Sequence, residues 1–371
     1  MFNLGFVMEQ ALGHITHHQN LARWVEVDAD ICPTWMPIPE HRDDRWETMP
    51  GVRDNWSLKS SLRAKEAIQK ALRTQKLDAL FLHTQTTALF SVPFMRKIPT
   101  IVSLDATPLN YDTVGAEYGH ISGNFSWLER RKYNWNRRTF TEATALTTWC
   151  QWAKDSLIAD YDIPAEKVTV IPPGVDLARW SFGKEKLENP IESEGPVRLL
   201  FVGGDFVRKG GNVLVEAFRN GLQQDCTLDI VTKEEVTAIA MAGIEGVKVH
   251  RGLTANSQPL RELYAKADIF VFPTLADCLP LAVMEAMAAG LPVIATNVGA
   301  LREEVEAGIN GVVVPPRDVS AIVDAVKFLL ENPHRRLTMA RASRQMAEER
   351  FDAQRNYCAI LALMKGICGR G

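Results

Sequence analysis

Short apolar runs alternate with helix-forming stretches along the first half of the chain. The runs lie at residues 2–8, 79–83, 100–105, 145–149 and 167–171. They are apolar nearly throughout, as strands buried on both faces of a parallel sheet are, and residues 58–76 repeat apolar side chains at helical spacing. The tryptophan-rich residues 24–56 have weak periodicity and several prolines, which predicts long loops. This half is therefore expected to form a doubly wound α/β domain.

A segment rich in proline, glycine and charge, residues 172–197, separates this half from a second alternating pattern. Such a composition without a long apolar repeat is typical of a domain boundary. The second set of apolar runs lies at residues 199–202, 228–232, 247–250, 269–272, 292–296 and 311–314. Helical stretches separate these runs, and two or three amphipathic helices follow them. We therefore expect a second doubly wound parallel sheet.

Length and composition narrow the class of protein. A chain of 371 residues is long enough for two domains, and a net charge of −3 gives no whole-protein case for nucleic-acid binding. The six cysteines are scattered without metal spacing, which favours a reducing compartment. The N-terminus carries no positively charged leader, and no apolar run reaches the roughly 20 residues that span a bilayer. We expect a cytoplasmic protein of undetermined oligomeric state.

Residues 129–139 form a basic helical stretch in which Tyr133 and Trp135 interrupt the charges. A solvated charged face is the simpler interpretation of this pattern. The alternative is peripheral contact with an anionic membrane at its inner surface, because basic and aromatic side chains together suit that interface.

Residues 269–300 combine a buried strand, a polar turn and an apolar helix that Pro280 opens and Gly290 ends. Asp277 lies at the mouth of this helix. Glu285 follows eight residues later, about 2.2 turns along the helix. A helix N-terminus at the end of a strand directs unpaired backbone N–H groups towards whatever lies beyond the sheet, so this stretch suits an anionic ligand.

The turn after the first apolar run of the second half reads FVGGDFVRKGG. Gly203 and Gly204 let the backbone approach a ligand closely, and Arg208 and Lys209 add two cations beside a helix N-terminus. Together these features predict a cradle for a diphosphate, with a glycine-rich turn and two solvated charges as the alternative. The turn contains neither GxGxxG nor GxxxxGK[ST], which excludes the dinucleotide fingerprint and the P-loop.

In the first half, His83 and Asp105 stand at the carboxyl ends of expected parallel strands, where such sheets bind their ligands. A histidine hydrogen-bonded at a strand end and a turn-forming aspartate are the structural alternatives. His14 and His17 follow Gly13 in a turn at another strand end. Their spacing matches no known metal site, so we expect them to line a pocket instead.

These motifs resemble those of the GT-B glycosyltransferases, and among them the retaining family 4. Asp277 and Glu285 match the family's two acids separated by seven residues, and AMAAGLPVIAT follows them as it does in the family. The stretches at 299–316 and 171–176 are similar to the next family block and to the interdomain segment, and FVGGDFVRKGG is similar to the phosphate-binding turn. The resemblance is strong over residues 167–330 and only topological before them.

The resemblance implies a fold and a division of the chain. Two Rossmann-like domains would face each other across a cleft, with the C-terminal helix crossing back onto the first domain. The implied parts are an acceptor-binding domain at residues 1–175, a linker at 176–197, a nucleotide-sugar donor domain at 198–350, and the returning helix at 351–371.

The resemblance also implies roles for individual residues. The catalytic groups would be Asp105, Lys209 and Asp277. Donor phosphates would contact Gly203, Gly204, Arg208, Lys209, Leu279, Pro280 and Leu281; the ribose and sugar would contact Asp277 and Glu285; the nucleobase would contact Arg251, Gly252 and Leu253; and the acceptor would contact Gly13, His14, His17 and His83. The fixed cations would then meet the negative charge that develops on the departing diphosphate.

The implied reaction moves a hexose from a UDP-, GDP- or ADP-linked donor to a glycan, a lipid-linked sugar or a small molecule. It would retain the anomeric configuration and need no cofactor or metal, because the Asp-x-Asp pair of Asp28 and Asp30 lies far in sequence from the donor elements and reads as solvated acids. Asp277 stands where the family usually has glutamate, and Asp105 stands where many members have histidine. A catalytically silent protein that binds nucleotide or glycan as a regulator or scaffold is the alternative.

Overall fold

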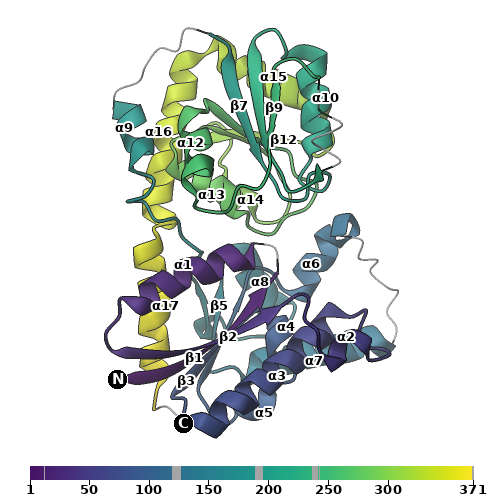
Figure 1. Cartoon of the computed structure of the whole chain (residues 1–371), viewed down its shortest axis with the longest axis vertical. Helices are drawn as coiled ribbons and strands as arrows, with labels where there is room; N and C mark the ends of the chain where they lie inside the picture. Colours follow the sequence, from purple (N-terminus) through teal and green to yellow (C-terminus); the bar gives the residue numbers. More distant parts are fainter. Residues whose placement is uncertain (12, 119–126, 189–194, 236–240, 242, 370–371) are drawn as a thin grey trace. The chain divides into compact units, whose positions relative to one another are not determined.

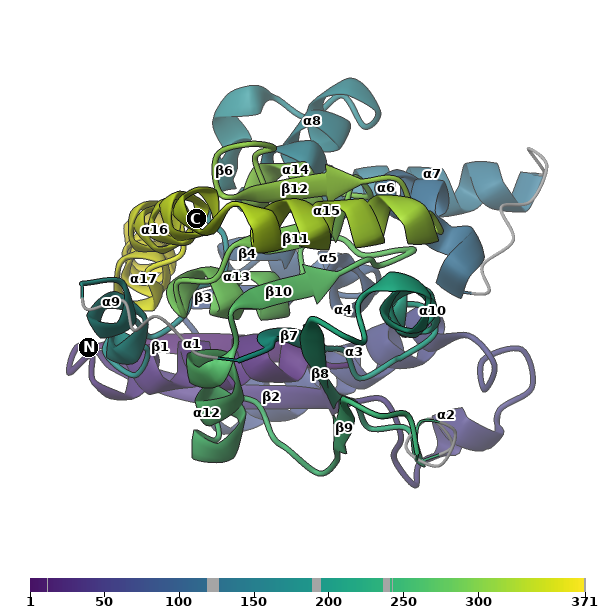
Figure 2. The same ribbon diagram turned by 90° about the horizontal axis from the view of Figure 1, so that it is seen from above.

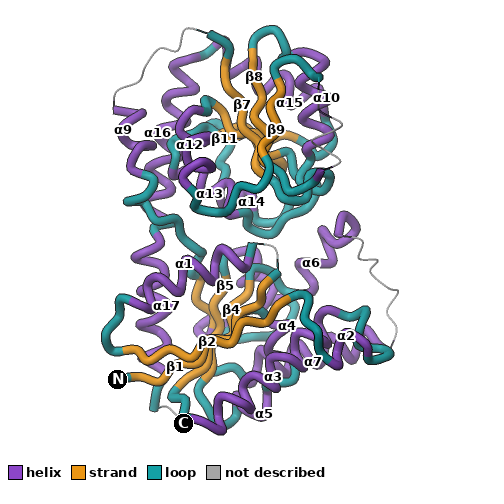
Figure 3. Tube along the Cα trace, in the orientation of Figure 1, coloured by secondary structure: helices purple, strands orange, loops and turns teal. Residues whose placement is uncertain are grey.

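The computed structural model describes residues 1–371 except 12, 119–126, 189–194, 236–240, 242 and 370–371. The chain forms two compact units (Figure 1). The first contains Met1–Asp112, Ile121–Gly174 and Ala353–Gly371, and the second contains Thr113–His120 and Val175–Asp352. Each unit is built on one sheet of six parallel strands with helices packed on it, which confirms the doubly wound prediction (Figure 3).

The sheet of the first unit has the strand order β2-β1-β3-β4-β5-β6. Its strands are β1 (Phe2–Gln10), β2 (Ile31–Pro39), β3 (Ala79–His83), β4 (Thr100–Leu104), β5 (Ala145–Thr148) and β6 (Val168–Val170). The helices of this part of the chain are α1 (His14–Glu26), α2 (Arg45–Thr48), α3 (Trp56–Thr74), α4 (Gln85–Ala88), α5 (Val92–Met95), α6 (Pro108–Val114), α7 (Trp127–Glu142), α8 (Gln151–Ala159) and α17 (Ala353–Ile367). One hydrophobic cluster joins the sheet to α3, α7 and α8, and a second joins it to α1 and α17. Both faces are therefore buried, which explains the continuously apolar strands.

The expectation of loops over residues 24–56 is wrong at β2. This strand pairs along its whole length with β1, from Phe2 opposite Ile31 to Gln10 opposite Pro39. Its prolines are tolerated because β2 is an edge strand, where one side of the backbone has no partner to receive its N–H groups. Trp35 from β2 stacks on the ring of Phe6 with centroids 4.6 Å apart, so this tryptophan packs on the sheet.

The sheet of the second unit has the strand order β12-β11-β10-β7-β8-β9, which can be followed strand by strand in Figure 2. Its strands are β7 (Val197–Val202), β8 (Cys226–Val231), β9 (Val247–His250), β10 (Ile269–Phe272), β11 (Val293–Thr296) and β12 (Gly311–Val314). The helices are α9 (Ser181–Glu188), α10 (Gly211–Gly221), α12 (Gln258–Lys266), α13 (Leu281–Ala288), α14 (Leu301–Glu304), α15 (Val319–Glu331) and α16 (Pro333–Arg350). Each strand begins and ends within two residues of a predicted apolar run.

Much of the segment expected as a linker, residues 176–197, packs within the second unit. Trp180 is fully buried and meets Tyr264 edge to face, with ring centroids 5.1 Å apart. Arg344 of α16 fixes the same turn, because its Nη1 donates to the carbonyl oxygens of Trp180 at 2.7 Å and Ala288 at 2.6 Å. The long segment of this unit therefore begins at Val175, although proline, glycine and charge dominate this stretch of the sequence.

The C-terminal helix returns to the first unit, as the fold prediction requires. Helix α17 lies against α1 and buries Tyr357 completely. Lys365 near its end donates to Asp28 at 2.8 and 2.9 Å and to Asp30 at 3.5 Å. Asp28, expected to be solvated, is thus engaged by this helix, whereas the side chain of Asp30 is 74% exposed as expected.

Trp180→Ala is expected to lower the free energy of unfolding by about 3–5 kcal/mol, because it leaves a large cavity among buried rings. Urea unfolding followed by circular dichroism measures the loss. Trp127→Ala removes a side chain that is 65% exposed and serves as the matched control, with an expected change within about 0.5 kcal/mol. An equally small change for Trp180→Ala would mean that the turn around residue 180 is only a linker.

Candidate active site

The carboxyl edge of the second sheet gathers the residues expected to bind a donor. Its neighbouring strands are all parallel, so the loops after β7, β9, β10 and β11 leave the sheet at the same edge. These loops carry Gly203 and Lys209, Arg251, Asp277 and Gly299. Residues that are up to 96 positions apart in the chain therefore lie along this one edge. We call the loops at the carboxyl edge of a sheet its rim.

Lys209 and Asp277 form an ion pair across two of these loops. Their side chains are only 15% and 11% exposed, and Lys209 Nζ also lies 5.4 Å from the centroid of the Phe272 ring. Burial lowers the pKa of Lys209, and the charge of Asp277 opposes that shift. Asp277 Oδ1 accepts the backbone N–H of Cys278 at 3.0 Å. The rim thus holds a cation and a carboxylate that have both lost most of their water, a state that requires each to remain paired.

Glycines allow the backbone to close around this ion pair. A Cβ atom at Gly203 would lie 2.8 Å from the Phe201 ring and 3.0 Å from Lys209 Cβ, so any side chain there would displace the lysine. Gly210 has a φ of +79°, and a Cβ atom at this position would lie 1.9 Å from the carbonyl oxygen of Pro273. The two glycines therefore fix where Lys209 emerges at the start of α10.

Arg208 connects the two loops rather than pointing away from them. Its Nε donates to Asp205 Oδ2 at 2.8 Å, and its Nη1 donates to the carbonyl oxygen of Ala276 at 2.8 Å. Gly204 on the same turn faces more open space, since the nearest atom to a Cβ there would be 3.7 Å away in Lys233. Arg208 holds the loop of Asp277 against the loop of Lys209 and adds positive charge beside them.

Glu285 lies in α13, beyond Leu279, Pro280 and Leu281 at the helix entrance. Its side chain is buried, and the hydroxyl of Tyr264 donates to Glu285 Oε2 at 3.0 Å. Burial raises the pKa of Glu285 to about 7, although the Tyr264 hydrogen bond acts in the opposite direction. This carboxyl can therefore exist in either protonation state near neutral pH.

Glu304 is a buried carboxyl that the sequence did not single out. It is fully buried, and neither of its oxygens has a hydrogen-bond partner among the residues that the structure describes. Burial raises its pKa well above the ordinary value; the charges of Asp277 and Glu303 add to the shift, and Lys209 opposes it. Glu304 is thus a neutral acid near the Lys209–Asp277 pair. In the sequence it is the second of two adjacent glutamates, which usually lie on a solvated helix face.

The expected nucleobase residues Arg251, Gly252 and Leu253 follow β9, the edge strand of the sheet. Gly252 has a φ of +73° and is exposed, and Arg251 Nη1 lies 3.4 Å from Glu235 Oε1. The structure places these residues on the rim that carries Lys209 and leaves their backbone accessible.

In the first unit, the carboxyl edge of the sheet brings together His14, Asp105 and a residue that the sequence did not predict, Glu9. His14 Nδ1 lies 3.1 Å from Glu9 Oε2, and His14 Nε2 lies 3.6 Å from Asp105 Oδ2. Gly13 is the N-cap of α1, so His14 is the first residue of the helix. Glu9 is the last but one residue of β1, so strand topology could have revealed it, but the apolar pattern hid it.

His17 and His83 lie beneath this trio and are fully buried. The rings of His83 and Trp149 stack with centroids 5.4 Å apart, and the ring of His17 lies 4.6 Å from that of His83. His17 Nδ1 lies 3.3 Å from the hydroxyl of Tyr357. Burial lowers the pKa of His17 to about 3 and that of His83 well below its ordinary value. Both rings are neutral and form a packed floor under His14.

Within the part of the chain that the structure describes, no group of three or more His, Cys, Asp or Glu side chains is arranged to hold a metal ion. The histidines at the start of α1 point to different partners, since His18 Nδ1 lies 2.9 Å from Gln10 Nε2.

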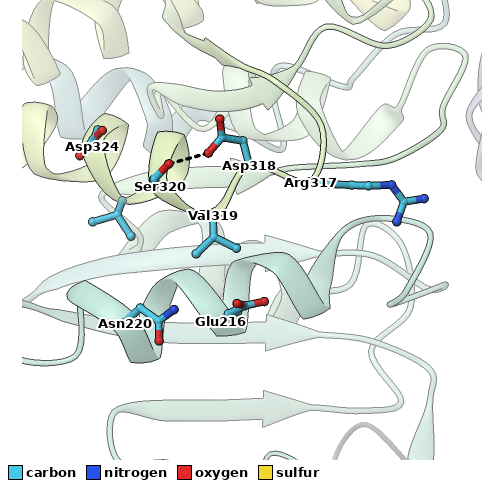
Figure 4. Close-up of a pocket in the computed structure, with 8 residues that line it drawn as sticks. Glu216, Asn220, Arg317, Asp318, Val319, Ser320 and Asp324 are labelled. Atoms are coloured by element: carbon cyan, nitrogen blue, oxygen red, sulfur yellow. Dashed lines mark hydrogen bonds between the residues drawn. The ribbon is translucent and has the colours of Figure 1, made fainter.

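A groove of about 690 Å³ lies between α10 and α15 (Figure 4). It is lined by Glu216, Asn220, Arg317, Asp318, Val319, Ser320, Val323 and Asp324. Ser320 donates to Asp318 at 2.8 Å within this lining. None of the predicted site residues lines the groove.

Comparison with known proteins places both halves of the chain in one group. The model of the glycosyl transferases group 1 matches residues 196–332, and the model of glycosyltransferase family 4 matches residues 19–179. Glycogen synthase of Mycobacterium tuberculosis is 29% identical over 272 residues, which is 69% of this chain and 60% of that protein. The chain thus spans about 60% of the length of this curated relative.

Solved structures share the whole fold at low sequence identity. Sucrose-phosphate synthase from Thermosynechococcus elongatus has a TM-score of 0.76 at 16% identity and covers 100% of both chains. Anabaena HepE in complex with UDP-glucose has a TM-score of 0.69 at 17% identity and covers 98% of this chain and 100% of that chain.

No described helix combines the length and apolar character needed to cross a bilayer. The two matched models follow one another along the chain, and the fold of the structural relatives matches this chain over its whole length. The chain therefore belongs to the GT-B glycosyltransferases of family 4.

Proposed function

We propose that this protein is a glycosyltransferase that moves a hexose from a nucleoside-diphosphate sugar to an acceptor. The buried Lys209–Asp277 pair at the carboxyl edge of the second sheet carries the proposal. A desolvated cation beside a glycine turn and a helix N-terminus suits a diphosphate. Support also comes from the relative named glycogen synthase and from the structural relative solved with UDP-glucose.

The chemistry follows from what the ion pair does when a donor arrives. Breaking the bond between the hexose and the diphosphate builds negative charge on the leaving group. Lys209 would turn from Asp277 to the phosphates, assisted by the backbone of Gly203 and Gly204 and by the N-terminus of α13. Asp277 would then be free to accept hydrogen bonds from hexose hydroxyls. The cation meets the leaving group, and the acid orients the sugar.

The remaining donor contacts follow the rim of the second sheet. Glu285 in its ionised form would accept from the two ribose hydroxyls, and the loop of Arg251, Gly252 and Leu253 would hold a uracil, guanine or adenine base. The pKa of Glu304 is raised, which favours its protonated form. In that form Glu304 adds no second negative charge beside Asp277 and the departing diphosphate.

The acceptor half is proposed for the first unit, where Asp105 and His14 reach the carboxyl edge of its sheet. Their side chains are 20% and 15% exposed, so both can contact a ligand. The acceptor class is a glycan, a lipid-linked sugar or a small molecule. In this arrangement Asp105 accepts a hydrogen bond from a sugar hydroxyl, and Gly13, His17 and His83 shape the floor.

We further propose that the reaction retains the anomeric configuration and proceeds without a metal. Lys365 engages Asp28 and Asp30 in the first unit, and Lys209 supplies a cation where charge develops. The departing phosphate would take the acceptor's proton on the face that the acceptor attacks.

Incubation with UDP-, GDP- and ADP-linked hexoses is expected to release the nucleoside diphosphate from one of the panel. Lys209→Ala should lower kcat by about 10²- to 10³-fold, because the charge on the leaving group loses its stabilising cation. Lys266→Ala, which removes an exposed lysine at the end of α12, is the matched control. Thermal stabilisation by a nucleotide without turnover would instead support the silent nucleotide-binding alternative. No stabilisation and no turnover with any donor would overturn both.

The affinity for the donor nucleotide should increase between about pH 6 and 8, because Glu285 ionises in this range and then accepts two hydroxyls. Glu285→Gln should remove this part of the pH dependence and weaken binding about tenfold at the upper end. Isothermal titration calorimetry across the range measures both effects. The phosphate of the nucleotide titrates in the same way with the wild-type protein and with Glu285→Gln. If the affinities of the two proteins changed equally with pH, the ribose role of Glu285 would be contradicted.

Helix α7 is proposed as a peripheral contact with an anionic membrane surface. Trp127 and Trp135 are 65% and 39% exposed, and the Arg131 guanidinium lies 5.4 Å from the ring of each. The opposite face buries Asn136 and Phe140 in the first unit. Exposed tryptophans interleaved with arginine suit the headgroup region of an anionic bilayer.

Wild-type protein should co-sediment with vesicles that contain phosphatidylglycerol and should remain in solution with phosphatidylcholine alone. A Trp127→Ala, Arg131→Ala, Trp135→Ala variant should lose this binding, because both the aromatic anchors and a cation are removed. Arg335→Ala, an exposed arginine on the second unit, is the control and should bind as the wild type does. Equal sedimentation of the triple variant would assign α7 to a solvated charged face.

A further inference from the structure

Glu9 is a carboxylate at the end of β1 that the proposed reaction does not yet use. It is only 3% exposed. Its oxygens are contacted by Trp56 Nε1 at 2.5 Å, Thr84 Oγ1 at 2.6 Å, Thr86 Oγ1 at 3.1 Å and His14 Nδ1 at 3.1 Å. These partners come from α1, α3 and the segment after β3, so four contacts fix the carboxylate from three directions. A buried carboxylate with this many donors is ionised and rigid.

This carboxylate determines the state of His14. One ring nitrogen of His14 faces Glu9, and the other faces Asp105. Burial alone would lower the pKa of His14, but its contacts with Asp105 and Glu9 outweigh burial and raise the pKa to about 10. Both ring nitrogens then carry protons: Nδ1 donates to Glu9, and Nε2 faces Asp105 at 3.6 Å, so His14 is a cation between two anions.

No other described group around the ring competes for this role. The titratable groups that pack here are Glu9 from β1, His17 and His18 from α1, His83 from β3, Asp105 after β4 and Tyr357 from α17. Burial lowers the pKa of His18, as it does for His17 and His83, so these three rings are neutral. The cluster holds one positive charge and two negative charges.

The three charged groups are ordered from the interior to the surface. The side chain of Glu9 is 4% exposed, that of His14 is 15% exposed, and that of Asp105 is 20% exposed. Glu9 is therefore shielded from a ligand and can act only through His14. Asp105 is the outermost group, and its Oδ1 already accepts the backbone N–H of Ala106 at 3.0 Å.

We propose that Glu9 is a positioning residue that keeps His14 as an imidazolium and thereby holds Asp105 as an ionised, oriented acceptor for a sugar hydroxyl. This inference rests on the proposed function of the first unit. Glu9 forms no contact with the substrate. It sets the tilt and the protonation of the imidazole, and the imidazolium in turn fixes the outward carboxylate. Loss of its charge would let His14 become neutral and let Asp105 rotate.

The decisive variant is Glu9→Gln, which keeps the size of the side chain and removes its charge. NMR titration of the histidine ring signals, with His14 assigned by comparison with His14→Asn, is expected to show a fall of His14 pKa by about one unit or more. Turnover should fall roughly 10- to 100-fold in kcat with little change in donor KM, because only Asp105 is disturbed. The alkaline limb of the pH profile should move to lower pH, since the imidazolium is present below its pKa and lost above it.

Glu66→Gln is the matched control. Glu66 also accepts an indole N–H, from Trp46 at 3.1 Å, but it does not contact the His14 cluster. The control should leave the titration of His14 and kcat unchanged. Glu9→Asp, which restores the charge, should recover part of the lost kcat and part of the shift in the pKa of His14. A purely structural role for Glu9 would lower thermal stability without moving the pKa of His14 or the pH profile.

Two outcomes overturn the proposal, and the first needs only the wild-type protein. In the wild-type protein, both ring nitrogens of His14 should be protonated at about pH 8 in ¹⁵N spectra, and a neutral ring would refute the charged trio. A shifted His14 pKa in Glu9→Gln with unchanged kcat would refute the positioning role. Wild-type protein without turnover on any donor would refute the proposed function instead, while the ¹⁵N measurement would still decide the charge on His14.

Discussion

The ion pair between Lys209 and Asp277 is the contact on which the rest of the second unit's rim depends. Each partner has lost most of its water, and an isolated buried charge is strongly unfavourable, so neither can remain charged without the other or a replacement. A diphosphate is such a replacement for the carboxylate, because it offers several anionic oxygens to the lysine. In the proposed function, a donor diphosphate would take the place of Asp277 as the partner of Lys209.

Parallel strands explain why each unit has one such rim. Every strand of a parallel sheet ends at the same edge, so short loops suffice to bring distant residues together. In the second unit this edge holds the loops of Lys209 and Asp277, which Arg208 ties to one another. In the first unit the same geometry collects Glu9 and Asp105 from strands that are separated by β3 in the sheet.

The sequence predicted what depends on local pattern and missed what depends on contacts across the chain. The buried strands were correct because burial on both faces leaves continuous apolar runs. Strand β2 was missed because its prolines argue against a strand unless it is known to lie at an edge. Trp180 was placed in a linker because surrounding proline and glycine dominate the local composition, while its packing partner Tyr264 lies 84 residues away. Glu9 and Glu304 were missed for the same reason, since only the fold reveals what surrounds a single acid.

The carboxyl edge of the first sheet also explains how this chain accommodates Asp105 where many family members have histidine. An aspartate alone at the end of β4 would present a carboxylate with no fixed orientation. Here His14 reaches the same place from α1 and donates towards that carboxylate, while Glu9 keeps the imidazole charged from behind. The imidazole is therefore present at the rim although it comes from another element of the sheet edge. A substitution that looks like a loss in the sequence therefore leaves an imidazole at this edge, supplied from α1 beside the carboxylate of Asp105.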